Sequence, residues 1–443
     1  MRQRPTALKT LSRKVVLATV GSLGDLHPFI ALAAALRDRG LNVHLACAPE
    51  YQGKVEAAGL AFHPLRPGFD DIQRDLGIDR AELTRRVVAD SGFLFRRLVL
   101  PYVREAYEDM MRIAADADLI VSSSLAFGAR LAGEKRGIPW IAVVLQPMMF
   151  LSSHDPPVIL EAARLSALLR TLGPTPVRYL LWILKKGVNR VFRPLHALRR
   201  DLGLKPTPQN PLFEGQFSHA GAIGLYSSLL GPVRPDYPQP TSIVGFTVFD
   251  SEDGRSGARD FALEEFLNSG PAPLVFTLGS LLINDPGNFY QQGLLAARIL
   301  GKRSVLLVGE QALDATASLA AADVFVCAYA PHSTLFPRAA AIIHHGGIGT
   351  LAQALRSGRP QLIVPHFADQ PDNAARAQRL GVARVLPPRR YRSATASREL
   401  RLLLGDDGLR ARARRTGEAV SAEDGAAQAS RIVLDTLERL RRE

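Results

Sequence analysis

Short apolar runs alternate with amphipathic segments along most of this 443-residue chain. The runs are rich in β-branched residues and too short for typical helices, so they predict buried strands. In the first half they fall at residues 14–20, 42–48, 119–122 and 140–144. Between them, segments 28–36 and 128–135 have apolar positions at helical spacing. Because alternating strands and helices build parallel sheets, the first half is predicted to be a doubly wound α/β domain.

The same alternation starts again in the second half. A helical pattern covers residues 289–300, and apolar runs occur at 274–278, 304–308, 324–328, 342–344 and 361–365. A chain of this length is expected to divide into two domains of about 200 residues each. We therefore predict two Rossmann-like parallel-sheet domains that face a central cleft, where the carboxyl ends of such strands bind ligands.

Two stretches interrupt the alternation. Residues 150–220 are rich in Leu and Arg and are broken by prolines, which predicts a helical insertion beside a pocket. Residues 231–240 are dense in proline, and such a connector is stiff rather than flexible. We place the interdomain linker there, so the predicted domains are residues 1–235 and 236–443.

The strongest chemical signal is the stretch from His344 to Thr350, which runs His-His-Gly-Gly-Ile-Gly-Thr between a strand-like run and a helical pattern. Glycines let the backbone approach an anion closely. The following helix N-terminus offers free N–H groups and a partial positive charge. This pattern predicts a phosphate-binding turn, and hence a nucleotide-type ligand, in the second half of the chain.

The region around this turn resembles the donor-binding signature of glycosyltransferase family 1, whose fold is called GT-B. The matching segments are Tyr329–His332, His345–Thr350 and Pro365–Asn373. The segment Gly24–Pro28 resembles the acceptor-side loop of the bacterial and sterol branches of that family. The likeness spans nearly the whole chain. It implies an acceptor-binding first domain and a donor-binding second domain.

The resemblance also implies roles for single residues of the second domain. His345 would donate to a diphosphate oxygen of a sugar nucleotide. Tyr329 would stack on the base, with His332 beside it where relatives usually have glutamine. Asp369 and Gln370 would hydrogen-bond the sugar hydroxyls. The other implied donor-site residues are Ser280, Gly347, Gly349 and Thr350 at the phosphates and Asn373 near the sugar.

On the acceptor side there are two candidates for the general base, Asp25 and His27. Many relatives have histidine where this chain and the bacterial and sterol branches have Asp25. An unperturbed aspartate, with a pKa of about 3.9, is a weak base toward an alcohol, but burial in a lipophilic cleft would raise that pKa. Relatives with histidine also use a carboxylate partner, near whose place this chain has Ser122. Since an aspartate base needs no second carboxylate, we favour Asp25 over His27.

Residues 146–157 are similar to a segment of bacterial rhamnosyltransferases that make glycolipids. The resemblance implies an adaptable apolar acceptor pocket lined by Gln146, Met148, Met149 and Phe150. We thus expect inverting, metal-independent transfer of a sugar to a hydroxyl of a flavonoid, hydroxy fatty acid or sterol. The expected co-substrate is dTDP-rhamnose, slightly favoured over UDP-glucose, with no further cofactor. A nucleotide-sugar epimerase of the same fold and a non-catalytic sugar-nucleotide binding protein remain as alternatives.

The composition argues against nucleic acid and metal ions as partners. The net charge is +13, but the densest arginine run, Arg410–Arg415, has no interleaved aromatic residues, so no nucleic-acid partner is expected. Only Cys47 and Cys327 occur, which argues against structural zinc or a disulfide framework and fits a cytoplasmic location. The string Asp116-Ala117-Asp118 has the DxD form of a metal site. It precedes a strand, at the wrong end for the cleft, and is interpreted as a solvated turn.

Membrane insertion is not expected, since no apolar run reaches the roughly 20 residues that span a bilayer. The basic segment from Met1 to Lys14 lacks the apolar core of a signal peptide. The most lipophilic segment, Tyr179–Leu184, is followed at once by Lys185 and Lys186. It predicts the buried face of a helix, with at most a weak contact with a membrane surface.

Overall fold

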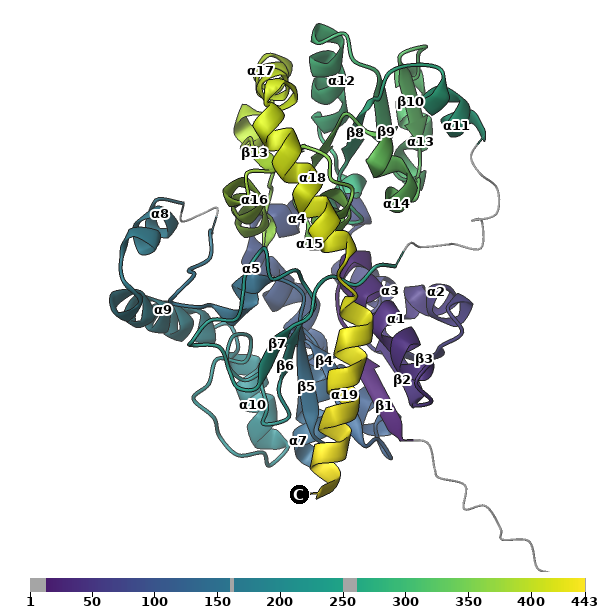
Figure 1. Cartoon of the computed structure of the whole chain (residues 1–443). Helices are drawn as coiled ribbons and strands as arrows, with labels where there is room; N and C mark the ends of the chain where they lie inside the picture. The colour runs from purple at the N-terminus through teal and green to yellow at the C-terminus, as the bar shows by residue number, and fades with distance from the viewer. Residues whose placement is uncertain (1–12, 160–162, 250–260, 443) are drawn as a thin grey trace, which may run out of the picture.

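The computed structural model describes residues 13–159, 163–249 and 261–442, so most of the basic segment from Met1 to Lys14 lies outside the described residues. Each half of the chain forms one parallel sheet covered by helices, and the two domains stand one above the other (Figure 1). The predicted architecture of two Rossmann-like domains is therefore confirmed.

The first sheet has seven strands in the order β3-β2-β1-β4-β5-β6-β7. Its strands are β1 (Lys14–Ala18), β2 (Asn42–Cys47), β3 (Ala61–Pro64), β4 (Leu119–Ser123), β5 (Trp140–Val144), β6 (Ala222–Gly224) and β7 (Thr241–Ile243). The helices of this half are α1 (Leu23–Arg37), α2 (Gln52–Ala57), α3 (Phe69–Leu76), α4 (Arg80–Ala89), α5 (Ser91–Phe93), α6 (Val103–Ile113), α7 (Phe127–Arg136), α8 (Ala163–Thr171), α9 (Pro174–Asn189) and α10 (Arg193–Asp201). The helical insertion predicted within residues 150–220 is thus confirmed as α8, α9 and α10.

The second sheet has six strands in the order β10-β9-β8-β11-β12-β13. Its strands are β8 (Leu274–Thr277), β9 (Ser304–Leu307), β10 (Val324–Cys327), β11 (Ala341–His344), β12 (Gln361–Ile363) and β13 (Ala383–Val385). The helices of this half are α11 (Phe261–Asn268), α12 (Phe289–Ile299), α13 (Leu313–Thr316), α14 (His332–Leu335), α15 (Ile348–Arg356), α16 (Gln370–Arg379), α17 (Ser393–Gly405), α18 (Asp407–Ser421) and α19 (Gly425–Arg442).

The apolar runs became strands because both faces of each sheet are covered. In β1, Val15 and Leu17 point into one core cluster, while Val16 and Ala18 point into the cluster on the other face. All four side chains are fully buried. Continuous apolar runs are what a parallel sheet buried on both faces requires.

The predicted linker at residues 231–240 is wrong in position. This stretch joins β6 to β7, and β7 pairs with β6 in the first sheet. The first sheet therefore extends past the boundary expected at residue 235, and the chain passes to the second domain between Ile243 and Phe261. Near its end the chain returns, because Ala429, Val433 and Leu437 of α19 belong to the core cluster that contains β1.

Candidate active site

The turn between β11 and α15 contains the predicted phosphate-binding residues. Gly346 has a φ of 89°, and a Cβ there would lie 2.8 Å from Ile363 Cγ2, so only glycine fits. Gly347 is the N-cap of α15, and this helix end has no side-chain cap and no acidic residue in its first turn. Gly349 and Thr350 follow, both partly exposed. Backbone N–H groups therefore dominate this helix end, which attracts anions.

The His345 ring fills the space between two glycines of neighbouring loops. A Cβ on Gly347 would lie 2.3 Å from His345 Nε2, and a Cβ on Gly279 would lie 2.5 Å from its Cε1. The side chain is buried, and its Nδ1 has no hydrogen-bond partner among the described residues. A buried ring nitrogen without a partner, beside an uncapped helix end, fits a phosphate oxygen.

His345 is neutral at physiological pH. Burial, followed by the charges of His344, His366 and His332, lowers its pKa well below the ordinary value. His344 has a different task, although burial lowers its pKa to about 4 as well. Its Nδ1 accepts from the Gly346 N–H at 3.1 Å, so its Nε2 donates to Gln361 Oε1 at 3.1 Å. His344 therefore holds the turn, while His345 faces the candidate ligand site.

Helix α16 brings the predicted sugar-binding residues to the same turn. Asn373 Nδ2 donates to the Gly346 carbonyl at 3.0 Å and to Asp369 Oδ2 at 2.7 Å, so it ties Asp369 to the phosphate turn. Gln370 Oε1 accepts from the backbone N–H of His366 at 2.8 Å, which commits one end of this side chain to holding the loop. Burial, opposed by the Asn373 bond and aided by the charge of Asp25, raises the pKa of Asp369 to about 7.

Asp25 lies on the first turn of α1, after the end of β1. Its Oδ2 accepts from the Ser22 N–H at 2.8 Å and from the Ser22 hydroxyl at 3.3 Å, which fixes the carboxylate at the helix end. Gly21 has a φ of 141°, and a Cβ there would lie 2.3 Å from the same oxygen. Burial raises the pKa of Asp25 to about 6, against the lowering effect of the Ser22 bonds. An aspartate with this pKa is a better base than an exposed one.

His27, the other candidate base, points elsewhere. Residues two apart on a helix do not face the same side. The His27 ring lies 5.3 Å from the ring of Phe249, on the stretch that leads to the second domain. Ser122 is buried, and its hydroxyl donates to the Ser123 carbonyl at 3.2 Å. Asp25 is thus the candidate whose charge reaches Asp369 of the other domain.

The N-terminal ends of α1 and α15 lie close together between the two domains. A Cβ on Gly349 of α15 would lie 3.8 Å from Cα of Gly24 on α1. Ile348 packs against the core cluster of the first domain. The carboxylate of Asp25 and the phosphate turn therefore belong to one site built from both domains.

The residues expected at the base lie at the carboxyl end of β10. Tyr329 is 45% exposed, and its ring lies 6.2 Å from that of His332. His332 in turn packs edge-on against Phe336 at 4.3 Å. Ser280 is exposed just after β8, and its carbonyl accepts from Asn284 Nδ2 at 3.2 Å.

The expected acceptor residues divide into two groups. Gln146 and Met148 are partly exposed, while Met149 and Phe150 are buried in the first-domain core. The Phe150 ring stacks on Tyr237 at 4.0 Å and on Phe217 at 5.6 Å, so both its faces are covered. Met149 and Phe150 thus belong to the first-domain core in this structure, and their place in an acceptor pocket stays a prediction.

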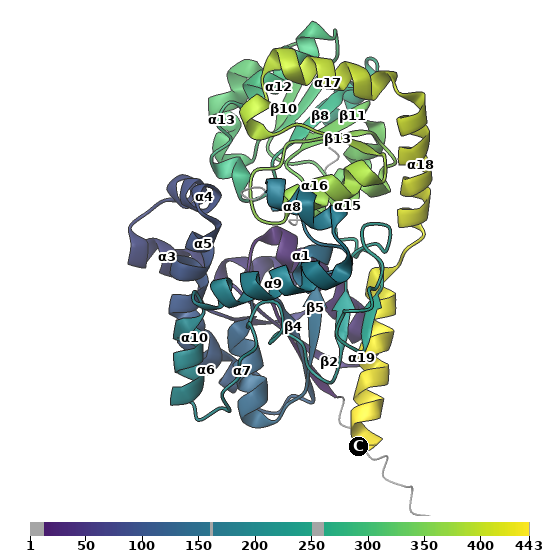
Figure 2. The ribbon, with the colours of Figure 1, turned by 90° about the vertical axis from the view of Figure 1, so that its left-hand side faces the viewer.

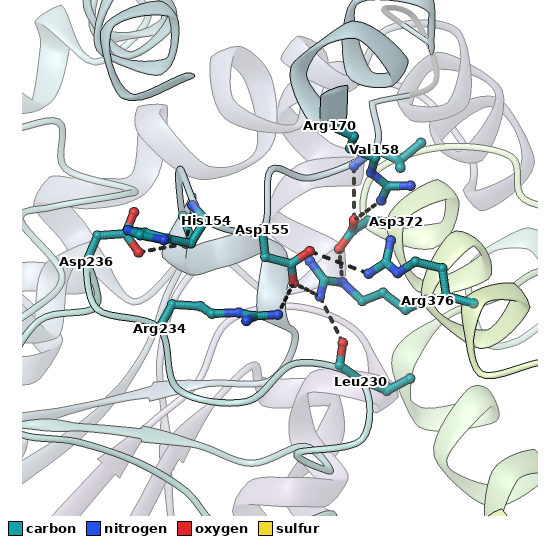
Figure 3. A network of polar contacts seen from close by, with 11 residues as sticks. His154, Asp155, Val158, Arg170, Leu230, Arg234, Asp236, Asp372 and Arg376 are labelled. Carbon is teal, nitrogen blue, oxygen red and sulfur yellow. Dashed lines mark hydrogen bonds and ion pairs between the residues drawn. The ribbon is translucent and has the colours of Figure 1, made fainter. Parts of the chain in front are cut away.

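A buried polar network joins the domains behind the site (Figure 3). Arg376 of α16 is 1% exposed, and its Nε donates to Asp372 Oδ2 at 2.6 Å. Its Nη1 reaches Asp155 of the first domain and the Leu230 carbonyl, the latter at 2.8 Å. The N–H of Val158 completes the link by donating to Asp372 Oδ1 at 2.9 Å. The two domains are thus held together along α16, the helix whose N-cap is Asp369.

Arg376 and His366 were not predicted as site residues from the sequence. An arginine four residues after Asp372 was a signal for an ion pair on one helix face, but nothing in the sequence identified Asp155 as its partner. Burial lowers the pKa of His366 to about 4, and its Nε2 has no partner among the described residues. His366 stood inside a matching segment, yet no role was assigned to it.

Within the described residues, no group of three or more His, Cys, Asp or Glu side chains could hold a metal ion. The DxD string lies at the amino end of β4, as predicted. Asp118 Oδ2 accepts from the Lys14 N–H at 2.7 Å, and Asp116 forms an ion pair with the Lys14 ammonium. The interpretation of this string as a turn outside the cleft is confirmed.

Comparison with known proteins now identifies the class. Residues 15–150 match the glycosyltransferase family 28 N-terminal domain, and residues 297–434 match the C-terminal domain described as erythromycin biosynthesis protein CIII-like. Over 432 residues the chain is 32% identical to O-mycaminosyltylonolide 6-deoxyallosyltransferase of Streptomyces fradiae, covering 95% of this chain and 96% of that enzyme. The chain therefore belongs to the GT-B glycosyltransferases, as the resemblance predicted. It is an enzyme that uses a nucleotide sugar as its donor.

Solved structures agree on the fold. The calicheamicin glycosyltransferase CalG4 superposes with a TM-score of 0.70 at 18% identity, covering 97% of this chain and 99% of that one. The spinosyn rhamnosyltransferase SpnG complexed with thymidine diphosphate gives a TM-score of 0.64 at 18% identity, covering 95% and 99%. The GT-B fold predicted from the sequence is thereby confirmed.

Proposed function

We propose that this enzyme is an inverting, metal-independent transferase that moves a sugar from dTDP-rhamnose, or from UDP-glucose, to a hydroxyl of a lipophilic acceptor. The proposal depends mainly on the two helix ends that lie close together between the domains. One holds Asp25, a carboxylate with a raised pKa, and the other is the uncapped turn beside His345.

In the proposed step, Asp25 takes the proton of the acceptor hydroxyl while the acceptor oxygen bonds to C1 of the sugar. The bond between C1 and the diphosphate oxygen breaks, and the diphosphate leaves with the electron pair toward α15. Because acceptor and leaving group lie on opposite sides of the sugar, a single displacement inverts the configuration at C1. Holding both partners in line supplies much of the rate.

The leaving diphosphate needs stabilisation as its charge develops. Neutral His345 would donate one hydrogen bond, and the N–H groups around Gly347, Gly349 and Thr350 would add others. These groups are in place before the reaction, so they do not have to reorganise. The mechanism therefore needs no metal ion.

We propose that the other donor-site residues bind the base and the sugar of the donor. Tyr329 offers an exposed ring for the base, with His332 next to it. Asp369 faces the sugar hydroxyls, held in place by Asn373. Gln370 would contribute from the start of the same helix, and Ser280 from the loop after β8.

A 6-deoxyhexose carried on thymidine diphosphate is favoured as the donor. The similar Streptomyces fradiae enzyme is named for a 6-deoxyallosyl group, and rhamnose is also a 6-deoxyhexose. The structural neighbour complexed with thymidine diphosphate is named as a rhamnosyltransferase. Both names favour dTDP-rhamnose over UDP-glucose.

For the acceptor we propose a flavonoid, a hydroxy fatty acid or a sterol, bound between the first domain and its helical insertion. Of the four expected acceptor residues, Gln146 and Met148 are partly exposed. A cytoplasmic location stays part of the proposal, since Cys47 and Cys327 are both free thiols, which suits a reducing compartment.

The test supplies dTDP-rhamnose and UDP-glucose separately to the purified enzyme, each with phenolic, hydroxy fatty acid and sterol acceptors. Nucleotide release and acceptor mass are followed together. We expect an acceptor heavier by one deoxyhexose, formed with release of dTDP, and no product with the Asp25→Asn variant. Interconversion of the donor sugar without a glycosylated acceptor would instead identify an epimerase. Donor binding without turnover of any kind would identify a non-catalytic binding protein.

A further inference from the structure

Exposed hydrophobic side chains gather on α8, α9 and the short turn between them. We call this surface the α8–α9 face. Seven of the fifteen large hydrophobic side chains that are exposed in the described part of the chain lie there. They are Leu165, Leu168, Leu172, Tyr179, Leu180, Trp182 and Ile183.

Helix α9 is apolar on two opposite sides. On the inner side, Val177 and Leu181 are 0% and 3% exposed and pack in a small cluster with Leu169 of α8. On the outer side, Tyr179 is 63% exposed and Ile183 is 47% exposed. A surface helix usually has one apolar stripe, which faces the core, so the second apolar side of α9 needs another explanation. Large exposed apolar patches mark interaction surfaces.

The charged residues of α8 and α9 are all basic. Residues 163–200 contain nine Lys or Arg residues and no Asp or Glu. Arg178 and Lys186 of α9, and Arg190 directly after it, are exposed and form no ion pair within the described residues. Arg193 and Arg200 of the following helix α10 are exposed and unpaired as well. An apolar face bordered by unpaired cations complements a bilayer that contains anionic lipids.

The aromatic residues of the face are arranged as at a membrane interface. The rings of Tyr179 and Trp182 stack with centroids 5.8 Å apart, and Lys186 Nζ lies 3.7 Å from the Trp182 ring centre. Trp and Tyr are enriched at the headgroup level, where their rings are half apolar and half polar. Lys can bury its chain along such rings while its ammonium stays at the headgroups.

The face lies next to the cleft. In Figure 2, α9 crosses the front of the first domain and α8 lies above it, below α16. The side chain of Arg170 on α8 is 4.0 Å from Asp372 on α16. A molecule that leaves a bilayer at this face therefore arrives close to α16, the helix whose N-cap is Asp369.

We propose that the α8–α9 face docks on the surface of a bilayer containing anionic lipids. The further statement that the lipophilic acceptor reaches the cleft from that bilayer rests on the proposed function. Docking would be peripheral, because none of the described helices has both the length and the apolar character needed to cross a bilayer. A single apolar segment would be weak evidence for bilayer docking. The α8–α9 face is stronger evidence, because it extends over two helices and has unpaired cations on its border.

The test measures sedimentation of the full chain with vesicles, without nucleotide or acceptor, so that a failed transferase assay does not affect it. Vesicles of phosphatidylcholine with about one third phosphatidylglycerol are compared with pure phosphatidylcholine. We expect binding to the anionic vesicles and much weaker binding to the neutral ones. The fluorescence of Trp182 should shift to shorter wavelength on binding, since its ring is 45% exposed in the free protein.

Two variants probe the two parts of the face. Replacing Tyr179, Trp182 and Ile183 by Ser should reduce vesicle binding at least tenfold. Replacing Arg178, Lys186 and Arg190 by Gln should reduce binding to anionic vesicles by about fivefold per cation removed, and this loss should shrink at high salt. These positions are exposed, so both variants should keep the wild-type melting temperature.

The matched control is Leu295→Ser with Ile299→Ser on α12 of the second domain, two exposed apolar residues at 47% and 55%. This control should bind vesicles like the wild type. Equal loss in the control, or no vesicle binding by the wild type at low salt, would overturn the proposal. The proposal would also be overturned if the wild type did not bind vesicles but formed a dimer, and if the serine variant were a monomer. The α8–α9 face would then be the interface with a second copy of this chain.

Discussion

Two turns of the molecule share a backbone plan and differ in what they hold. In the first domain, Gly21 precedes α1 with a φ of 141°, and Asp25 is the third helical residue. In the second, Gly346 precedes α15 with a φ of 89°, and Thr350 is the third helical residue. Each turn follows a central strand of its sheet, and the two turns lie close together between the domains.

The difference lies in the side chain at the third position. The Asp25 carboxylate accepts the Ser22 N–H, so α1 is capped by the protein itself. Helix α15 has no such cap. The first turn thus supplies its own negative charge as the proposed base, while the second is left to receive the charge of a diphosphate. Glycines shape both turns. The residue at the third helical position, Asp25 in α1 and Thr350 in α15, determines whether the helix end is capped or can bind an anion.

The largest expected effect comes from Asp25→Asn, which keeps the shape of the first turn and removes its charge. We expect kcat/KM to fall by about a thousandfold, within the range for loss of a general base. Donor affinity, measured by calorimetry, should stay unchanged. Near-normal turnover would show that another group takes the proton.

The pH dependence of kcat/KM gives a second test of Asp25 as the base. The base must be ionised, so wild-type kcat/KM should rise with pH and level off above about 6. A raised folded-state pKa means that the folded protein holds this proton more tightly than the unfolded chain. The stabilisation from this group is complete below pH 3.8 and is lost as the pH rises through about 6. The melting temperature of Asp25→Asn at pH 7 should therefore equal or exceed that of the wild type.

The next largest effect tests the second turn through His345→Ala. Loss of a donor to the leaving group should lower kcat by about a hundredfold to a thousandfold. His345→Asn keeps a neutral donor and should recover part of the loss. His366→Ala, which removes a neutral, partly buried histidine from the loop after β12, should lower kcat less than His345→Ala. If His345→Ala stays within threefold of the wild type, the diphosphate does not depend on this ring.

Arg376→Met tests whether the two turns must be held in register. It leaves Asp372 buried without its partner, so the free energy of unfolding should fall by about 3 kcal/mol. Denaturant titration measures this loss. Arg412→Met on α18 is the control, because the Arg412–Asp406 pair is partly exposed at 3.9 Å and should contribute less than about 0.5 kcal/mol. Equal stability of the two variants would mean that the network in Figure 3 does not fasten the domains.

The smallest effect comes from Thr350→Asp, which gives α15 the third-position carboxylate of α1. The new charge should cap the helix and repel the diphosphate, so donor affinity should fall roughly tenfold. The melting temperature should not decrease. Thr350→Ser, which keeps the hydroxyl, should bind the donor like the wild type. Unchanged donor affinity in Thr350→Asp would place the diphosphate away from this helix end.

Much of this arrangement could be predicted from local sequence. Buried parallel strands are visible as apolar runs, and the turn from His344 to Thr350 carries its glycines and helix start together. The features that escaped prediction depend on contacts between distant residues. Nothing near Phe150 in the sequence indicates that its ring stacks on Tyr237. Arg376 could not be linked to Asp155 without knowledge of the packed domains.

The return of α19 has a consequence for how the protein is made. Ala429, Val433 and Leu437 lie in the same core cluster as Val15 and Leu17 of β1. In addition, Arg39 donates to the Ser430 hydroxyl at 2.8 Å. During synthesis, the first domain therefore lacks part of its hydrophobic core until the residues of α19 have left the ribosome. A fragment that stops before α19 should leave the apolar surface of α1 open to aggregation or to chaperones.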